Sequence, residues 1–253
     1  ANAKISLTGP DLEYGIKITD MPSADLATQQ ASLFWLSVLD APISGSLRGG
    51  IDSRGISQPV AAALRIGEGA IKPSDETRAI PFKSADAYFT YDPVQEIITF
   101  DQISVNSDWI RGNAEGAAEL TLEENGLPSE IDVTLGATDL IASESGPWAQ
   151  DIAFKDARVA FGLQVDPFRL MIDEASIRYK DVTLTAGGDI LGDDSGWAYR
   201  LGGNMPKVTH EDVVSLWPEN LAPRTRAWMS NNVSQAIYEN VRFDMEARPD
   251  QPL

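Results

Sequence analysis

The chain has 253 residues and a formal net charge of −18, from 38 acidic and 20 basic side chains. This charge argues against nucleic acid as a partner and against broad docking on an anionic membrane surface, since both would repel it. The chain has no cysteine, which excludes disulfides, thiolate metal sites and thiol chemistry. No stretch of about 18 apolar residues predicts a membrane-spanning helix, and the N-terminus has no signal-peptide pattern.

Residues 1–79 are predicted to be β-rich, with one helix. The first residue is Ala1 and a strand-like run follows at once, so we expect a segment of a longer protein. Ser23 can cap a helix, and apolar residues at helical spacing predict that it extends from about residue 24 to residue 40. Pro42 lies just past its expected end. This helix would separate sheet segments or cover a sheet edge.

A repeat relates the next two segments. The run that begins at Ile80 recurs at Ile152, a step of 72 residues, and the same step relates Phe89 to Phe161. Because the step is even, residues that alternate along a strand keep the same face in both copies. The sequence therefore predicts two β units, residues 80–151 and residues 152–208, stacked in an extended architecture.

Turn signals and alternating apolar residues predict antiparallel strands throughout both units. Asp92-Pro93 and Asp166-Pro167 mark turns between strands, and strands spaced about 8–12 residues apart are typical of a meander. The predicted fold is mainly β, a long curved antiparallel sheet with a few short helices. Residues 209–232 are predicted to be helical, with Thr209 as an N-cap, and residues 233–253 to start a further strand unit.

Signatures of catalysis are nearly absent. His210 is the only histidine, so no multi-histidine metal site can form, and we interpret it as a solvated or capping residue at a helix start. No nucleophile elbow and no phosphate-binding loop is present. We therefore predict no enzyme activity, no catalytic residue, no metal site and no cofactor.

The candidate functional feature is an apolar strand face that both units share. Composition favours an ordinary core, packed on a sheet or a helix. The few predicted helices look insufficient to cover a large sheet, so either the sheet folds over on itself or an apolar ligand fills the face. The candidate groove residues are Ala87, Phe89, Tyr91, Phe100, Val133, Leu135, Val159, Phe161, Leu163 and Ile172.

One segment resembles a known family. The stretch 216–229 contains Trp217-Pro218, then Leu221-Ala222-Pro223, then Arg226-Ala227-Trp228, and it resembles a segment of the YhdP branch of the AsmA-like family. The strand patterns at 42–49, 64–71 and 80–105 are similar to strands of the same family. The resemblance covers nearly the whole chain.

The resemblance implies a bridge-like lipid-transfer protein. Such proteins are anchored in the inner membrane of Gram-negative bacteria and extend through the periplasm as an open β-groove that carries phospholipids towards the outer membrane. The expected partners are phospholipid acyl chains, and contacts with inner- and outer-membrane envelope proteins would involve regions outside this segment. Two alternatives stay open: a structural envelope scaffold without a lipid conduit, and a glycan-acting or glycan-binding β-protein in which Trp109, Trp148 and Trp197 share one cleft with an acidic pair.

Overall fold

The computed structural model describes residues 2–8, 12–146 and 148–249. Residues 1, 9–11, 147 and 250–253, which belong to the predicted segments 1–79, 80–151 and 233–253, lie outside the described residues. Strands make up 61% of the chain and helices 13%, so the prediction of a mainly β fold is confirmed.

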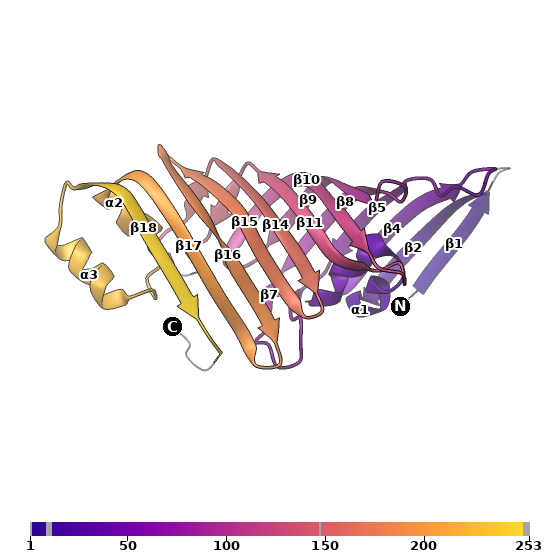
Figure 1. Cartoon of the computed structure of the whole chain (residues 1–253), viewed down its shortest axis with the longest axis horizontal. Helices are drawn as coiled ribbons and strands as arrows, with labels where there is room; N and C mark the ends of the chain where they lie inside the picture. Colours follow the sequence, from indigo (N-terminus) through magenta and orange to yellow (C-terminus); the bar gives the residue numbers. More distant parts are fainter. Residues whose placement is uncertain (1, 9–11, 147, 250–253) are drawn as a thin grey trace.

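The described elements form one large open sheet and one small sheet. The large sheet follows the order β1-β2-β4-β5-β8-β9-β10-β11-β14-β15-β16-β17-β18, with β12 and β13 attached beside β10, and every pairing is antiparallel. Its bounds are β1 Asn2–Thr8, β2 Leu12–Pro22, β4 Pro42–Ile51, β5 Val60–Ile66, β8 Ser84–Asp92, β9 Ile97–Asn106, β10 Ile110–Leu122, β11 Pro128–Ala137, β12 Leu140–Ala142, β13 Ile152–Phe154, β14 Asp156–Val165, β15 Phe168–Tyr179, β16 Val182–Asp193, β17 Gly196–Thr209 and β18 Ile237–Ala247. The small sheet contains β3 Leu39–Asp40, β6 Gly69–Ile71 and β7 Ile80–Phe82. Figure 1 shows the curved large sheet extending from β1 at one end to β18 at the other.

Alternation along the strands follows the predicted pattern. In β8, Ala87, Phe89 and Tyr91 are buried, whereas Tyr88 between them is 43% exposed. The predicted turn after β8 is present, because Asp92 Oδ1 accepts hydrogen bonds from the backbone N–H groups of Val94 and Gln95 at 2.9 and 3.1 Å. These bonds stabilise the carboxylate and lower the pKa of Asp92.

The 72-residue step has a counterpart in the hydrogen-bond register. Asp101 is an extra residue in β9 against β8, and Asp173 is an extra residue in β15 against β14. On the next strand, Gly116 and Gly188 lie beside these bulges. A bulge bends and twists the strand that carries it, so the same curvature is introduced at the same place in both copies.

The prediction of one helix over residues 24–40 is wrong. The segment forms a short α-helix, α1 (Ser23–Ala27), and a separate 3₁₀ helix, η1 (Ala31–Val38). Gln30 between them has extended dihedral angles of −157° and 145°, which interrupt the helical hydrogen bonds. Ser23 is not the N-cap, because its hydroxyl donates to the carbonyl of Leu39. Burial of apolar residues against the sheet therefore decides the path of this segment.

The helical prediction near the C-terminus is confirmed. Helix α2 covers His210–Leu216 and helix α3 covers Pro223–Asn232. The Thr209 hydroxyl accepts a hydrogen bond from the backbone N–H of Asp212 at 3.2 Å, as expected for an N-cap. Among the described residues, no helix has both the length and the apolar character needed to cross a membrane.

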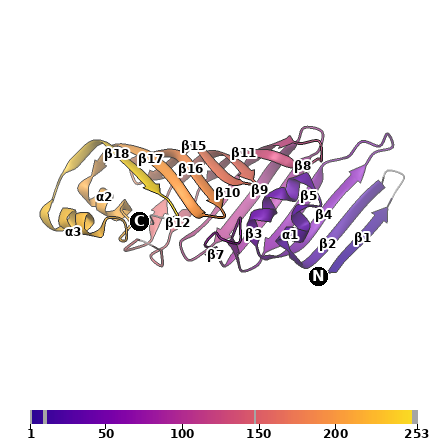
Figure 2. The ribbon, with the colours of Figure 1, turned by 60° about the horizontal axis from the view of Figure 1, so that its bottom comes forward.

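The main core lies where the N-terminal helices meet the sheet. Leu33 and Leu36 of η1 are 1% and 0% exposed, and they belong to one apolar cluster with Phe89 and Leu64 of the sheet. Figure 2 shows α1 beside the inner side of the N-terminal strands. The two helices thus fill the inner face of the sheet at its N-terminal end.

Candidate functional site: an apolar cavity under the curved sheet

A cavity of about 350 Å³ lies on the inner face of the middle of the sheet. Its floor is made by apolar side chains of β5, β8, β9, β10, β11 and β14. These are Ile66, Ala85, Ala87, Ile98, Phe100, Ile103, Ala118, Ile131, Val133, Leu135, Phe161 and Leu163. Because these side chains present no hydrogen-bonding group, the floor offers an apolar ligand only van der Waals contact.

The roof of the cavity comes from segments that lie apart from the large sheet. Trp35 of η1 contributes, and so does the small sheet, in which Leu39 lies opposite Ile71 and Ile71 lies opposite Ile80. Pro81 and Phe82 complete this side. The cavity is therefore enclosed between the curved sheet and a separate apolar cover.

The turn between β9 and β10 forms a mouth with apolar side chains. Trp109 is 51% exposed and Ile110 is 38% exposed, and both also line the cavity. The Ser107 hydroxyl accepts hydrogen bonds from their backbone N–H groups at 3.2 and 3.0 Å, which holds the turn in place. An apolar chain leaving the cavity would reach solvent beside these two side chains.

The structure brings six of the ten predicted groove residues into the cavity wall: Ala87, Phe100, Val133, Leu135, Phe161 and Leu163. Phe89 points to the same face but is only 1% exposed, because it lies within the apolar cluster that also contains Leu33 and Leu36 of η1. Tyr91 is also buried, at 5% exposure. Val159 and Ile172 lie half-buried on the inner face, outside the cavity wall.

The inner face carries an unbroken apolar row in strict register. Each member lies directly opposite the next on the neighbouring strand, through Val60, Tyr91, Ile98, Ala118, Val133, Phe161, Ile172, Gly188, Leu201 and Met245. Members up to Val133 are buried, and members from Phe161 onward are half-buried. The next row of paired residues, which faces outward, contains Asp92, Glu119, Asp132, Asp189, Arg200 and Glu246. The inner row is thus buried in its N-terminal half and partly accessible in its C-terminal half.

Among the predicted groove residues, Tyr91 is the one with a titratable group. Burial raises the pKa of its phenol, and the nearby charges of Glu96 and Asp92 raise it further. The phenol therefore stays neutral at physiological pH, so no charge develops on the inner row.

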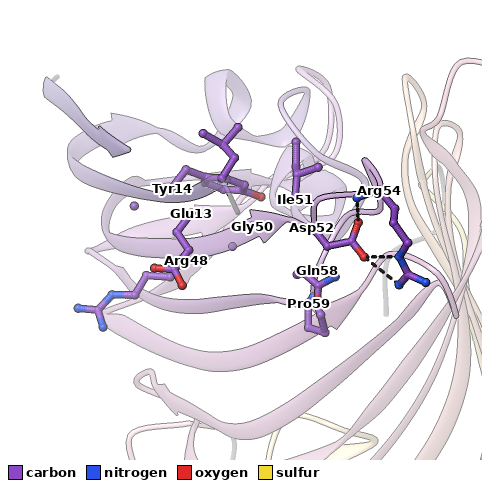
Figure 3. Close-up of a pocket in the computed structure, with 12 residues that line it drawn as sticks. Glu13, Tyr14, Arg48, Gly50, Ile51, Asp52, Arg54, Gln58 and Pro59 are labelled. Atoms are coloured by element: carbon purple, nitrogen blue, oxygen red, sulfur yellow. Dashed lines mark hydrogen bonds and ion pairs between the residues drawn. The ribbon is translucent and has the colours of Figure 1, made fainter. Parts of the chain in front are cut away.

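A polar hollow of about 920 Å³ lies elsewhere, where β2 and β4 meet the loop before β5 (Figure 3). Two of its charged residues, Asp52 and Arg54, pair with each other. Asp52 accepts hydrogen bonds from the backbone N–H of Ile56 at 2.9 Å and from the Arg54 guanidinium at 2.9 and 3.0 Å, and these interactions lower the pKa of Asp52. We assign no ligand to this exposed surface.

Other residues discussed from the sequence have structural roles. His210 was interpreted as solvated or capping, but it is buried, and its Nδ1 lies 2.9 Å from the Tyr238 hydroxyl. The tryptophans of the glycan hypothesis have different partners: Trp109 lines the cavity, Trp148 donates to the carbonyl of Leu216, and Trp197 donates to a backbone carbonyl of a distant loop. Within the described part of the chain, no group of three or more histidine or acidic side chains could hold a metal ion.

The roof residues were missed from the sequence. The additional floor residues Ile98, Ala118 and Ile131 could have been found from strand register, since they lie opposite the predicted residues Tyr91, Val133 and Leu163. Trp35, Ile71 and Ile80 could not, because they reach the cavity from segments that the sheet periodicity does not connect.

The fold and site define an open, curved antiparallel sheet that partly encloses an apolar cavity. Comparisons with models of known protein families, with curated proteins and with solved structures found no match for the chain.

Proposed function

We propose that this chain is a segment of a conduit that carries lipid acyl chains along the inner face of its sheet. The observation that supports this proposal most is the unbroken apolar row from Val60 to Met245. From Phe161 to Met245, where the row is only half-buried, similar surroundings on successive strands allow an acyl chain to move along it without meeting a polar barrier. No proton transfer or covalent step is required, so the proposed role is binding and guidance rather than catalysis.

The cavity is the most enclosed part of this path. At about 350 Å³ it is at the small end of the range for ligand pockets, which suits an acyl chain better than a whole phospholipid. Burial of each CH₂ group contributes about 0.8 kcal/mol, so a chain in the cavity is held out of water while the headgroup stays in solvent. The net charge of −18 also favours a headgroup that remains away from the protein surface.

The resemblance of residues 216–229 to the YhdP branch of the AsmA-like family suggests the setting. By this analogy the cargo is phospholipid, the location is the periplasm of a Gram-negative bacterium, and the whole protein is anchored in the inner membrane and supports the outer-membrane barrier. These finer statements depend on the resemblance, whereas the acyl-chain proposal depends on the apolar row.

A structural scaffold is the second candidate. It is favoured by the cover over Phe89, because α1 and η1 pack that part of the inner face with protein. In this alternative the partly accessible C-terminal half would be packed by further protein instead of lipid.

Photo-crosslinking in cells separates the two candidates. A photoreactive residue replaces Phe161 or Ile172 on the inner face, and matched controls replace Arg158 and Glu174, exposed residues of the same two strands. The conduit proposal predicts crosslinked phospholipid from the first pair only, and none from Phe89, which is buried in the main core. Crosslinks from Phe161 and Ile172 to protein alone, or equal labelling at all positions, would contradict the conduit.

A further inference from the structure

The loop between β6 and β7 reaches the β16–β17 hairpin, in the C-terminal half of the large sheet. Residues 72–79 connect two strands of the small sheet, yet two of them contact the β16–β17 hairpin, 119 residues away. The Ser74 hydroxyl donates to the carbonyl of Asp193 at 3.1 Å, and the Trp197 indole N–H donates to the carbonyl of Arg78 at 2.6 Å. These two bonds link segments from the two halves of the chain.

Side-chain packing supports both bonds. The Trp197 ring meets the Phe168 ring edge to face, with centroids 5.5 Å apart, so the indole is held in the orientation that donates to the loop. A Cβ on Gly192 would lie 2.9 Å from the Pro73 ring, which shows how closely the loop approaches the hairpin. The hairpin thus provides a rigid surface on which the loop packs.

The loop itself has an internal framework. Thr77 is 3% exposed, and it exchanges hydrogen bonds with Ser74: the Ser74 N–H donates to the Thr77 hydroxyl at 3.1 Å, and the Thr77 N–H donates to the Ser74 hydroxyl at 3.2 Å. The loop is therefore held together as one unit by its own hydrogen bonds.

The loop and the hairpin belong to opposite edges of the curved sheet. The loop leaves the small sheet near the edge where β5 ends and β8 begins, whereas the hairpin tip at Asp193 lies at the other ends of the antiparallel strands. Figure 1 shows the loop after β6 beside the tip of the β16–β17 hairpin. The loop thus spans the open side of the sheet, next to the roof residues Ile71 and Ile80.

We propose, on the basis of the proposed function, that residues 72–79 form a clasp that controls lateral access to the apolar inner face. With the clasp seated, the side of the sheet that it spans is closed, and an acyl chain reaches the cavity only beside Trp109 and Ile110 or along the length of the sheet. Release of the clasp opens the side of the sheet and admits a chain from that direction. Two hydrogen bonds and one close contact are few enough to break and reform without unfolding of the sheet.

A reversible crosslink tests the clasp directly, because the chain has no other cysteine. Pro73→Cys with Gly192→Cys places two thiols within disulfide reach, given the 2.9 Å approach at Gly192. The probe is a phospholipid with a fluorescent acyl chain in phosphatidylethanolamine vesicles, and the measurement is its rate of transfer to the whole chain. Since a closed disulfide removes the open population, we expect transfer to be roughly ten-fold slower in the oxidised protein, with recovery on reduction.

The oxidised and reduced forms have the same sequence, so any strain from the new Cβ beside Trp197 cancels in the comparison. Equal transfer rates in the two forms, with probe bound in both, would overturn the clasp and leave the proposed function intact. Absence of probe binding to the unsubstituted chain as well would overturn the proposed function and the clasp together.

A second variant loosens the clasp without a crosslink. Trp197→Phe removes the N–H that donates to Arg78 and retains an aromatic ring against Phe168. Loss of one such hydrogen bond should raise the open population, and with it the transfer rate, about five-fold. The control is Trp228→Phe, at a site that is 59% exposed on α3. An unchanged rate in Trp197→Phe, with the circular dichroism spectrum preserved, contradicts the clasp.

Discussion

Gly116 and Gly188 have the same close approach to a neighbouring strand. An ideal Cβ on Gly116 would lie 2.0 Å from the carbonyl oxygen of Thr134, and one on Gly188 would lie 2.0 Å from the carbonyl oxygen of Arg200. Gly188 also has a φ of +141°, which L side chains rarely adopt. The two glycines therefore let the strands approach beside each bulge, where the sheet bends.

Substitution of either glycine should destabilise the protein. For Gly116→Ala and for Gly188→Ala we expect the free energy of unfolding to fall by about 1–3 kcal/mol, because backbone must move to admit the Cβ. Chemical denaturation followed by circular dichroism measures this change. Gly136→Ala is the control, since a Cβ there has no neighbour within 4 Å. A loss in the control equal to that in the other two variants would contradict the explanation.

Truncation of Leu36 should reveal how strongly η1 is packed. Leu36 is 0% exposed in the main core, so Leu36→Ala should lower the free energy of unfolding by about 2–5 kcal/mol. Val94→Ala, at a turn residue that is 70% exposed, should change it by less than about 0.5 kcal/mol. Thermal unfolding measures both variants. If Leu36→Ala lost no more stability than Val94→Ala, η1 would not be tightly packed against the sheet.

A polar group in the cavity wall should weaken acyl-chain binding. Phe161→Asn places a polar amide among the apolar side chains of the floor. A bound acyl chain would bury this amide without giving it a hydrogen bond, so affinity for a fluorescent fatty acid should fall about ten-fold. Ala160→Asn alters the adjacent residue, which faces the other side of β14, and should leave affinity unchanged. Titration of both variants with the probe measures the difference, and equal affinities would place the binding site elsewhere.

The ion pair of Lys180 with Asp212 should make stability depend on pH. The two groups lie 2.6 Å apart. Burial raises the pKa of Asp212, but hydrogen bonds from Lys180 and Thr209 outweigh it, so the net pKa is lowered. A lowered carboxyl pKa gives stability that is fully present above about pH 4 and is lost as pH falls through the folded-state pKa.

The hydrogen bond with Asp212 also raises the pKa of Lys180, so its contribution is lost only as pH rises through that raised pKa, in alkaline solution. At pH 7, Asp212→Asn should lower the free energy of unfolding by about 1 kcal/mol. The difference from the unsubstituted chain should vanish below the folded-state pKa of Asp212. Asp75→Asn, whose carboxylate is fully exposed, serves as the control. The free energies of unfolding of Asp212→Asn and of the unsubstituted chain are compared from pH 7 to pH 2. If their difference stayed constant over this range, the ion pair would not be its source.

Local patterns in the sequence were enough to predict the sheet. Alternation at Ala87, Phe89 and Tyr91 and the turn at Asp92 are properties of a few neighbouring residues, and the structure retains them. The helix over residues 24–40 was predicted from the same kind of signal and was wrong. There, contacts of Leu33 and Leu36 with distant strands outweighed the weak local preference for a continuous helix.

The sequence by itself determined which residues share a face, because side-chain direction alternates with a period of two whatever surrounds the strand. Only the tertiary structure decided what lies over that face: an apolar core shared by η1 and Phe89, the small sheet on the cavity that Phe161 lines, and a half-buried surface beyond. The contact of Trp197 with Arg78 joins residues 119 positions apart. Such contacts arise from the curvature of the whole sheet, which no short stretch of sequence encodes.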